Sequence, residues 1–247
     1  MKQIFMTFMM LVQLSFAGEI SIAVAANVSY AIKPLVKAFH ETHPQTKVHV
    51  ILGSSGKLFA QISHGAPYDL FMSANMKYPN RLYEDNLTIG KPVIYAQGAL
   101  ALFSSKSRKF DTGLKLLTEE NIKRIAVANP KTAPYGIATQ EALKHAKIYE
   151  TVKEKFVYGE SISQTLIYAT SAADMGVVAK SSLYAPQMLV YKKGTHWVDV
   201  DTSLYTPIDQ GMVLLKSTKN KDEVQTFYDF MQSATSKKIL ASFGYKV

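Results

Sequence analysis

The sequence predicts an α/β protein in which two lobes, each built of a sheet flanked by helices, enclose a ligand cleft. Strand-like and helix-like segments alternate along most of the chain, which is typical of sheets with crossover helices. Two strand-like runs, residues 93–103 and 212–215, are placed to cross between two such lobes. Turns rich in small polar residues link several strands to the helices that follow them, and ligands bind at such turns.

In the first lobe, strand and helix patterns follow one another closely. Pro34 lies inside the first helical pattern, so either the first turns are irregular or the helix begins close to Pro34. We expect strands at 20–24, 47–52 and 68–73, and helical segments at 28–39, 58–62 and 76–84.

The run 93–103 is long and contains Gly98, and beyond it the alternation of strands and helices restarts. Ser161 and Gln164 form a capping box that opens a helix. We expect strands at 125–128, 175–179, 188–191, 196–200 and 212–215, helices at 134–145 and 148–156, and two amphipathic C-terminal helices before Gly244. The predicted lobes are 18–97 with 207–247, and 98–206.

The composition is that of an ordinary globular protein, with 247 residues, 47% hydrophobic and 19% charged. The net charge of +9 comes from scattered lysines without interleaved aromatic residues, so we expect a solvated exterior and no nucleic-acid partner. The chain has no cysteine, which excludes disulfides, thiolate metal sites, cysteine nucleophiles and a lipid-modified N-terminal cysteine.

The first 17 residues have the pattern of a signal peptide. Lys2 precedes an apolar run at 4–14, and the small residues Ser15 and Ala17 suit cleavage after Ala17. The run is shorter than the about 20 residues that a membrane span needs. We therefore expect an exported, periplasmic protein whose mature chain starts near Gly18.

The turn at residues 53–58 has the character of an anion site. It offers free backbone N–H groups, the hydroxyls of Ser54 and Ser55, and the positive end of a helix dipole. A similar turn at 25–29 follows the first strand, and we expect the two turns to face each other across a cleft. Two more turns, 129–136 and 159–162, open helices of the second lobe, so the four helix starts together supply many donors and little formal charge.

Other chemistries fit the residues less well. The turn at 53–58 has two residues between its glycines where a phosphate loop needs four, and its pattern is not a nucleophile elbow. His40 and His43 lie near a helix end at a spacing that a zinc-protease helix does not use. An exported serine hydrolase remains as a rival, with Ser54 or Ser55 activated by His64 and Asp69.

Several stretches together resemble the extracytoplasmic molybdate-binding proteins of ABC transporters, over essentially the whole mature length. They are 25–29, 54–58, 65–74, 133–136, 176–178 and 226–230. The resemblance implies a type II periplasmic-binding-protein fold with mixed sheets that closes on molybdate or tungstate. It implies a monomer that delivers the anion to a membrane permease, with no enzymatic activity and no cofactor.

The same resemblance implies the site residues. Asn27, Ser55, Tyr135 and the backbone N–H of Ile162 would bind the oxyanion, so molybdenum would be held only as that anion. The supporting residues would be Ala26, Ser54, Gly56 and Ser161.

The chain departs from one version of the family pattern in two places. Some members have Ser at the position of Asn27, and both residues can donate hydrogen bonds. Some have Ala at the position of Tyr135 and Tyr at that of Ala179, so the phenol could have changed sides of the cleft. Sulfate, phosphate and ferric ion remain alternative ligands.

Overall fold

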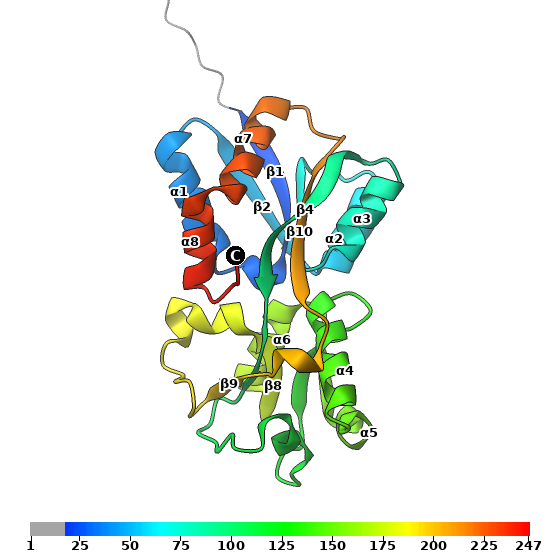
Figure 1. The fold of residues 1–247 in the computed structure, drawn as a ribbon, viewed down its shortest axis with the longest axis vertical. Coiled ribbons are helices and arrows are strands. Elements are labelled where there is room, and N and C mark those ends of the chain that lie inside the picture. The colour runs from blue at the N-terminus through cyan, green and yellow to red at the C-terminus, as the bar shows by residue number, and fades with distance from the viewer. Residues whose placement is uncertain (1–17) are drawn as a thin grey trace, which may run out of the picture.

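The computed structural model describes residues 18–247 and places their strands in two five-stranded sheets (Figure 1). The strand order is β2-β1-β3-β10-β4 in the first sheet and β7-β6-β8-β5-β9 in the second. Both sheets are mixed, and helices flank each of them, which agrees with the predicted α/β architecture. The predicted signal peptide and its cleavage after Ala17 lie outside the described residues.

The first sheet has three parallel strands and two strands that run antiparallel to their neighbours. Its strands are β1 (Glu19–Ala25), β2 (Lys47–Gly53), β3 (Leu70–Ser73), β4 (Thr88–Gly98) and β10 (Ile208–Leu215). The helices of this lobe are α1 (Ile32–Thr42), α2 (Ser55–Ser63), α3 (Lys77–Glu84), α7 (Lys221–Gln232) and α8 (Ala234–Ser242).

The core of the first lobe joins the start of the chain to its end. Ile22 of β1 packs with Phe39 of α1 and Phe227 of α7, whose rings meet edge to face with centroids 5.0 Å apart. On the other face of the sheet, Leu58 of α2 packs with Phe71 of β3. Burial of these apolar side chains fixes α1 and α2 against β1 and β2, and so fixes where the helices begin.

The structure decides the question that Pro34 left open. Residues Ala26–Val28 form a short 3₁₀ helix, η1, and α1 begins at Ile32. Pro34 is therefore in the first turn of α1, where a missing backbone N–H costs no intrahelical hydrogen bond.

The second sheet contains β5 (Leu100–Phe103), β6 (Ile125–Ala128), β7 (Phe156–Gly159), β8 (Met175–Ala179) and β9 (Trp197–Asp199). Its α-helices are α4 (Pro134–His145), α5 (Tyr149–Val152) and α6 (Ile162–Ser171). Short 3₁₀ helices lie at Gly113–Thr118, Lys153–Lys155, Lys180–Tyr184, Pro186–Met188 and Thr202–Leu204. Val127, Leu143 and Val177 lie in the core of this lobe.

Two predictions of secondary structure were wrong. The predicted helix 148–156 ends early and Phe156 begins strand β7, because β7 is a short edge strand whose apolar residues continue the helical spacing by chance. The predicted strand 188–191 follows a 3₁₀ helix instead. Only Met188 of this run is buried, while Leu189 and Val190 are exposed, so the run does not belong to a sheet.

The chain passes between the two sheets at neighbouring points. β4 ends at Gly98 and β5 begins at Leu100, whereas β10 brings the chain back to the first sheet (Figure 1). Ile208 of β10 pairs with Gly98, so the two crossings lie side by side. The lobe limits at 97 and 206 stay a prediction. No helix within residues 18–247 is long and apolar enough to cross a membrane.

Candidate functional site

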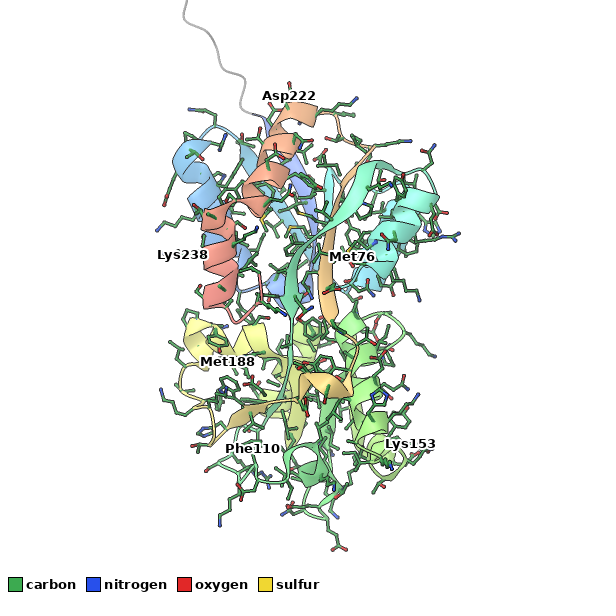
Figure 2. All side chains as sticks on the ribbon, viewed as in Figure 1. Met76, Phe110, Lys153, Met188, Asp222 and Lys238 are labelled. Atoms are coloured by element: carbon green, nitrogen blue, oxygen red, sulfur yellow. The ribbon has the colours of Figure 1, made fainter. Side chains whose placement is uncertain are left out.

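A small cavity of about 10 Å³ lies where helix starts of both lobes come together. Its lining contains no charged side chain, and the labelled Asp222, Lys153 and Lys238 lie at the outer surface (Figure 2). The residues that line it are Ala25, Ala26, Asn27, Ser54, Ser55, Ala74, Ala133, Pro134, Tyr135 and Ile162.

Backbone N–H groups at four helix starts border this cavity. Asn27 lies in η1, Ser55 begins α2, Tyr135 is the second residue of α4 and Ile162 begins α6. Within residues 18–247 the amides of these four residues have no acceptor, as expected of a first helical turn. Such N–H groups carry the positive end of the helix dipole, so the cavity presents donors from both lobes.

The prediction that the turns at 25–29 and 53–58 face each other across a cleft is wrong. They lie side by side in the first lobe, because β1 and β2 are parallel neighbours and Ala25 pairs with Gly53 at their carboxyl ends. The turns across the cavity come from the second lobe, at α4 and α6. Parallel strands end at the same edge of a sheet, so only a second sheet could supply the opposite wall.

The Ser55 side chain is almost fully buried, and a backbone N–H holds its oxygen in place. Ser55 Oγ accepts a hydrogen bond from the backbone N–H of Ala74 at 2.9 Å, which leaves the hydroxyl hydrogen for another acceptor. Ser54 stands at the N-cap position of α2 but makes no side-chain cap bond. Ser55 therefore offers both its hydroxyl and its amide at the cavity.

The Asn27 side chain is bound by residues distant in sequence. Its Nδ2 donates to Gln210 Oε1 at 2.7 Å and to the Tyr245 hydroxyl at 2.8 Å. Gln210 Nε2 donates to the Ile208 carbonyl at 2.8 Å, which fixes Oε1 as the atom that faces Asn27. Asn27 Oδ1 is buried without a partner among the described residues.

This pairing corrects the expectation that the Asn27 side chain donates at the site. Both hydrogens of its Nδ2 are used inside the protein, so the side chain presents an acceptor and only the backbone N–H remains as a donor.

The Tyr135 side chain is also almost fully buried. Its hydroxyl has no hydrogen-bond partner among the described residues. Burial, and then the neighbouring Tyr245 phenol, raise the pKa of Tyr135 well above its usual value, so the phenol stays neutral and able to donate. Ala179 ends β8 in the second-lobe core and is not among the residues that line the cavity.

The remaining predicted residues act around the cavity. Ser161 caps α6, with its Oγ accepting from the Gln164 N–H at 3.3 Å, which confirms the predicted helix start. Gln164 Oε1 accepts from the Glu160 N–H at 2.8 Å and not from the Ser161 N–H, so the capping box is only half formed. The Gly56 amide donates to the Thr132 carbonyl at 2.9 Å, and Ser163 Oγ donates to the Ala26 carbonyl at 2.7 Å. These two bonds join the lobes on either side of the cavity.

Comparison with known proteins gives the family. A model of the bacterial extracellular solute-binding protein family matches residues 20–246. The chain belongs to this family. It is 35% identical to the molybdate-binding protein ModA of Rhodobacter capsulatus over 232 residues, which are 93% of this chain and 88% of the relative. It is 34% identical to ModA of Azotobacter vinelandii over 231 residues, 93% of this chain and 90% of the relative.

Solved structures agree. The periplasmic molybdate-binding protein of Azotobacter vinelandii matches this solute-binding protein with a TM-score of 0.86 and 31% identity, covering 92% of this chain and 99% of that one. The predicted resemblance and fold class are therefore confirmed. Family members are extracytoplasmic binding proteins of transport systems, so the prediction that the chain is not an enzyme is confirmed as well.

The geometry also excludes the rival hypothesis that this solute-binding protein is a serine hydrolase. His64 follows the last residue of α2 whereas Ser55 begins that helix, so the helix separates the proposed base from the nucleophile. Asp69 Oδ2 accepts from the Ser21 N–H at 2.6 Å, and it precedes β3, whose other end leads to the cavity. Neither residue can activate Ser55.

The His40 and His43 pair is part of a helix end. His40 Nε2 bonds the Thr46 carbonyl oxygen at 2.9 Å, and the His43 ring stacks on Phe39 at 4.7 Å. Within residues 18–247 no group of three His, Cys, Asp or Glu side chains could hold a metal ion.

Proposed function

We propose that this solute-binding protein captures molybdate, and also tungstate, in the cavity between its lobes. The observation that carries the proposal is the set of helix-start N–H groups without acceptors around a cavity that has no charged side chain. The relatives named as molybdate-binding proteins align with nearly the whole chain, which supports this choice of anion. We further propose that the protein is a periplasmic monomer, exported by cleavage after Ala17, which delivers the anion to an ABC permease.

Each donor has a distinct role in this proposal. Ser55 donates through its hydroxyl and its N–H, Tyr135 through its phenol and its N–H, and Asn27 and Ile162 through their N–H groups. Ala26 and Ser54 shape the wall, Gly56 closes the cleft and Ser161 holds the start of α6. Molybdenum is held only as the oxyanion, with no direct protein ligand to the metal.

Hydrogen bonding without countercharge suits a transported dianion. Burying a dianion costs many kcal/mol unless its oxygens are hydrogen-bonded, and hydrogen bonds to a charged group contribute about 1.5 to 3 kcal/mol each. Because no fixed positive charge lines the cavity, the anion is retained by the closed geometry and is released when the lobes part.

One observation favours a second candidate ligand, hydrogenphosphate. This anion carries a proton that needs an acceptor, and Asn27 Oδ1 is a buried acceptor without a partner among the described residues. Ferric ion fits poorly, because a ferric site needs anionic ligands and the pKa of Tyr135 is raised by burial.

The test is a set of titrations of the purified protein with molybdate, tungstate, sulfate and phosphate, followed by melting temperature and calorimetry. Ligand at a hundred times its dissociation constant stabilises by about 2.7 kcal/mol, which is readily measured. We expect large shifts with molybdate and tungstate and almost none with sulfate. An equal shift with sulfate refutes the choice of anion, and a larger one with phosphate favours the second candidate.

Melting temperature is a better readout here than the fluorescence of the single tryptophan. Trp197 lies in β9, packs near Tyr184 and donates its ring N–H to the Tyr191 carbonyl at 3.2 Å. It is not among the residues that line the cavity.

Light scattering with and without ligand tests the proposal that the protein is a monomer. The mass of the exported protein tests the proposed cleavage after Ala17.

A further inference from the structure

The tip of the Tyr135 side chain lies against the backbone of Gly98, where the chain first crosses between the lobes. A Cβ atom built on Gly98 would lie 2.1 Å from Tyr135 Oη and 3.1 Å from its Cζ. It would also lie 3.0 Å from Gln210 Nε2 on the neighbouring crossing strand. The phenol of the second lobe thus lies against β4, the strand by which the chain first crosses between the lobes.

Space, and not backbone conformation, requires glycine at this position. Gly98 does not have a positive φ, unlike Gly90 on the same strand, so the backbone at 98 would accept alanine. A methyl group at 2.1 Å from the phenol oxygen is far inside van der Waals contact, so the two groups cannot occupy these positions together.

The phenol has few ways to move aside. Tyr135 is 1% exposed and packs in the core of the second lobe with Ala128, Ala138 and Val177. Tyr135 also borders unfilled space, namely the cavity that it lines with Asn27, Ser55 and Ile162. A side chain at 98 therefore pushes the phenol toward the space where the anion is proposed to bind.

We propose that Gly98 is a specificity-determining position, whose missing side chain sets the depth of the Tyr135 phenol and hence the size of the anion cavity. The inference rests on the proposed function for the identity of the anion, but the contact between Gly98 and Tyr135 does not. Because molybdate and tungstate are larger than sulfate, a phenol displaced into the cavity weakens their binding more than that of sulfate. Gly98 touches no ligand in this scheme and acts only through Tyr135.

The experiment is a double-mutant cycle with Gly98→Ala, Tyr135→Phe and the double variant, compared with the parent. Calorimetry gives the affinities for molybdate and sulfate, and melting temperatures are measured without ligand. Gly98→Ala should weaken molybdate binding by about tenfold or more, equivalent to about 1.4 kcal/mol, and weaken sulfate binding less. In the Tyr135→Phe background the oxygen at 2.1 Å is gone, so the same methyl should cost about threefold or less.

Gly211→Ala is the matched control. It also adds a methyl to a buried glycine of a crossing strand. There the nearest atom is the Met76 sulfur at 2.6 Å, and none of the three nearest atoms belongs to Tyr135. It should lower the melting temperature without changing the ratio of molybdate to sulfate affinity.

Equal fold losses from Gly98→Ala with and without the Tyr135 hydroxyl would overturn the inference, and so would equal losses for molybdate and sulfate. If the parent binds none of the anions, the proposed function fails, while the melting temperatures of the cycle still test the contact. If Gly98→Ala does not fold, recovery of folding by Tyr135→Phe supports the inference and its absence overturns it.

Discussion

The amide N–H of Gly56 donates to the carbonyl oxygen of Thr132 at 2.9 Å, which ties α2 of the first lobe to the loop before α4 of the second. A Cβ atom on Gly56 would lie 2.9 Å from that carbonyl oxygen and 3.1 Å from Thr132 Cα. It would also lie 2.8 Å from the hydroxyl of Tyr78, a partly exposed side chain that can shift. Close approach of the lobes therefore depends on glycine at position 56.

We predict that Gly56→Ala weakens molybdate binding by about 1 to 3 kcal/mol, because the added methyl holds the lobes apart. The melting temperature without ligand should change less than the affinity, since the helix preference of alanine offsets part of the crowding at the lobe contact. Calorimetry gives the affinity and small-angle scattering reports whether ligand still compacts the protein. Unchanged affinity and compaction would show that the contact has no role in closure.

For Ser55→Ala we expect a loss of about 1 to 3 kcal/mol in molybdate affinity, because one anion oxygen loses its hydroxyl donor. The unliganded protein should lose about 1 kcal/mol of stability too, since the Ala74 N–H loses its acceptor. Ser63→Ala, at the exposed far end of the same helix, is the control. A variant with reduced stability but full affinity would make Ser55 a structural residue only.

Tyr135→Phe should shift affinity and stability in opposite directions. The phenol oxygen is buried without a partner among the described residues, so its removal should leave the unliganded protein as stable or more stable. Molybdate affinity should fall by about 1 to 3 kcal/mol as the donor disappears. Calorimetry and thermal melts check both effects. Full affinity in Tyr135→Phe would exclude the phenol as a ligand.

Ala179→Tyr should not improve molybdate binding, because Ala179 is packed in the second-lobe core.

Stability should fall in alkali because of the tyrosines beneath the cavity. Burial raises the pKa of Tyr245 from 10.0 to about 12. Since the folded protein holds this proton more tightly than the unfolded chain, the contribution is fully present below pH 10 and is lost as pH rises toward 12. Denaturant unfolding at several alkaline pH values measures the loss, which should be smaller in Tyr245→Phe. Equal pH dependence in both proteins would contradict this assignment.

Much of the architecture could be predicted from the sequence because it depends on residues close together in the chain. The spacing of apolar residues marks α4 and β8 at the bounds that the structure has, and Ser161 with Gln164 marks the start of α6. The small residues of the helix starts point to free N–H donors, and the order of these stretches predicts the family. In contrast, edge strand β7 was missed, because its few half-buried residues carry no period of their own.

The chemistry inside the cavity was decided only by the tertiary structure. The sequence predicts that the Asn27 side chain donates a hydrogen bond to the anion. In the structure its amide orientation is set by Gln210 and Tyr245, which lie 183 and 218 residues further along the chain. In the sequence, Gly98 only marks a long strand that is placed to cross between lobes, whereas in the structure the space taken by the Tyr135 phenol is what requires glycine there. Helix and strand periods are properties of neighbouring residues, whereas the partner of a buried amide and the space beside a glycine depend on which distant segments the fold brings together.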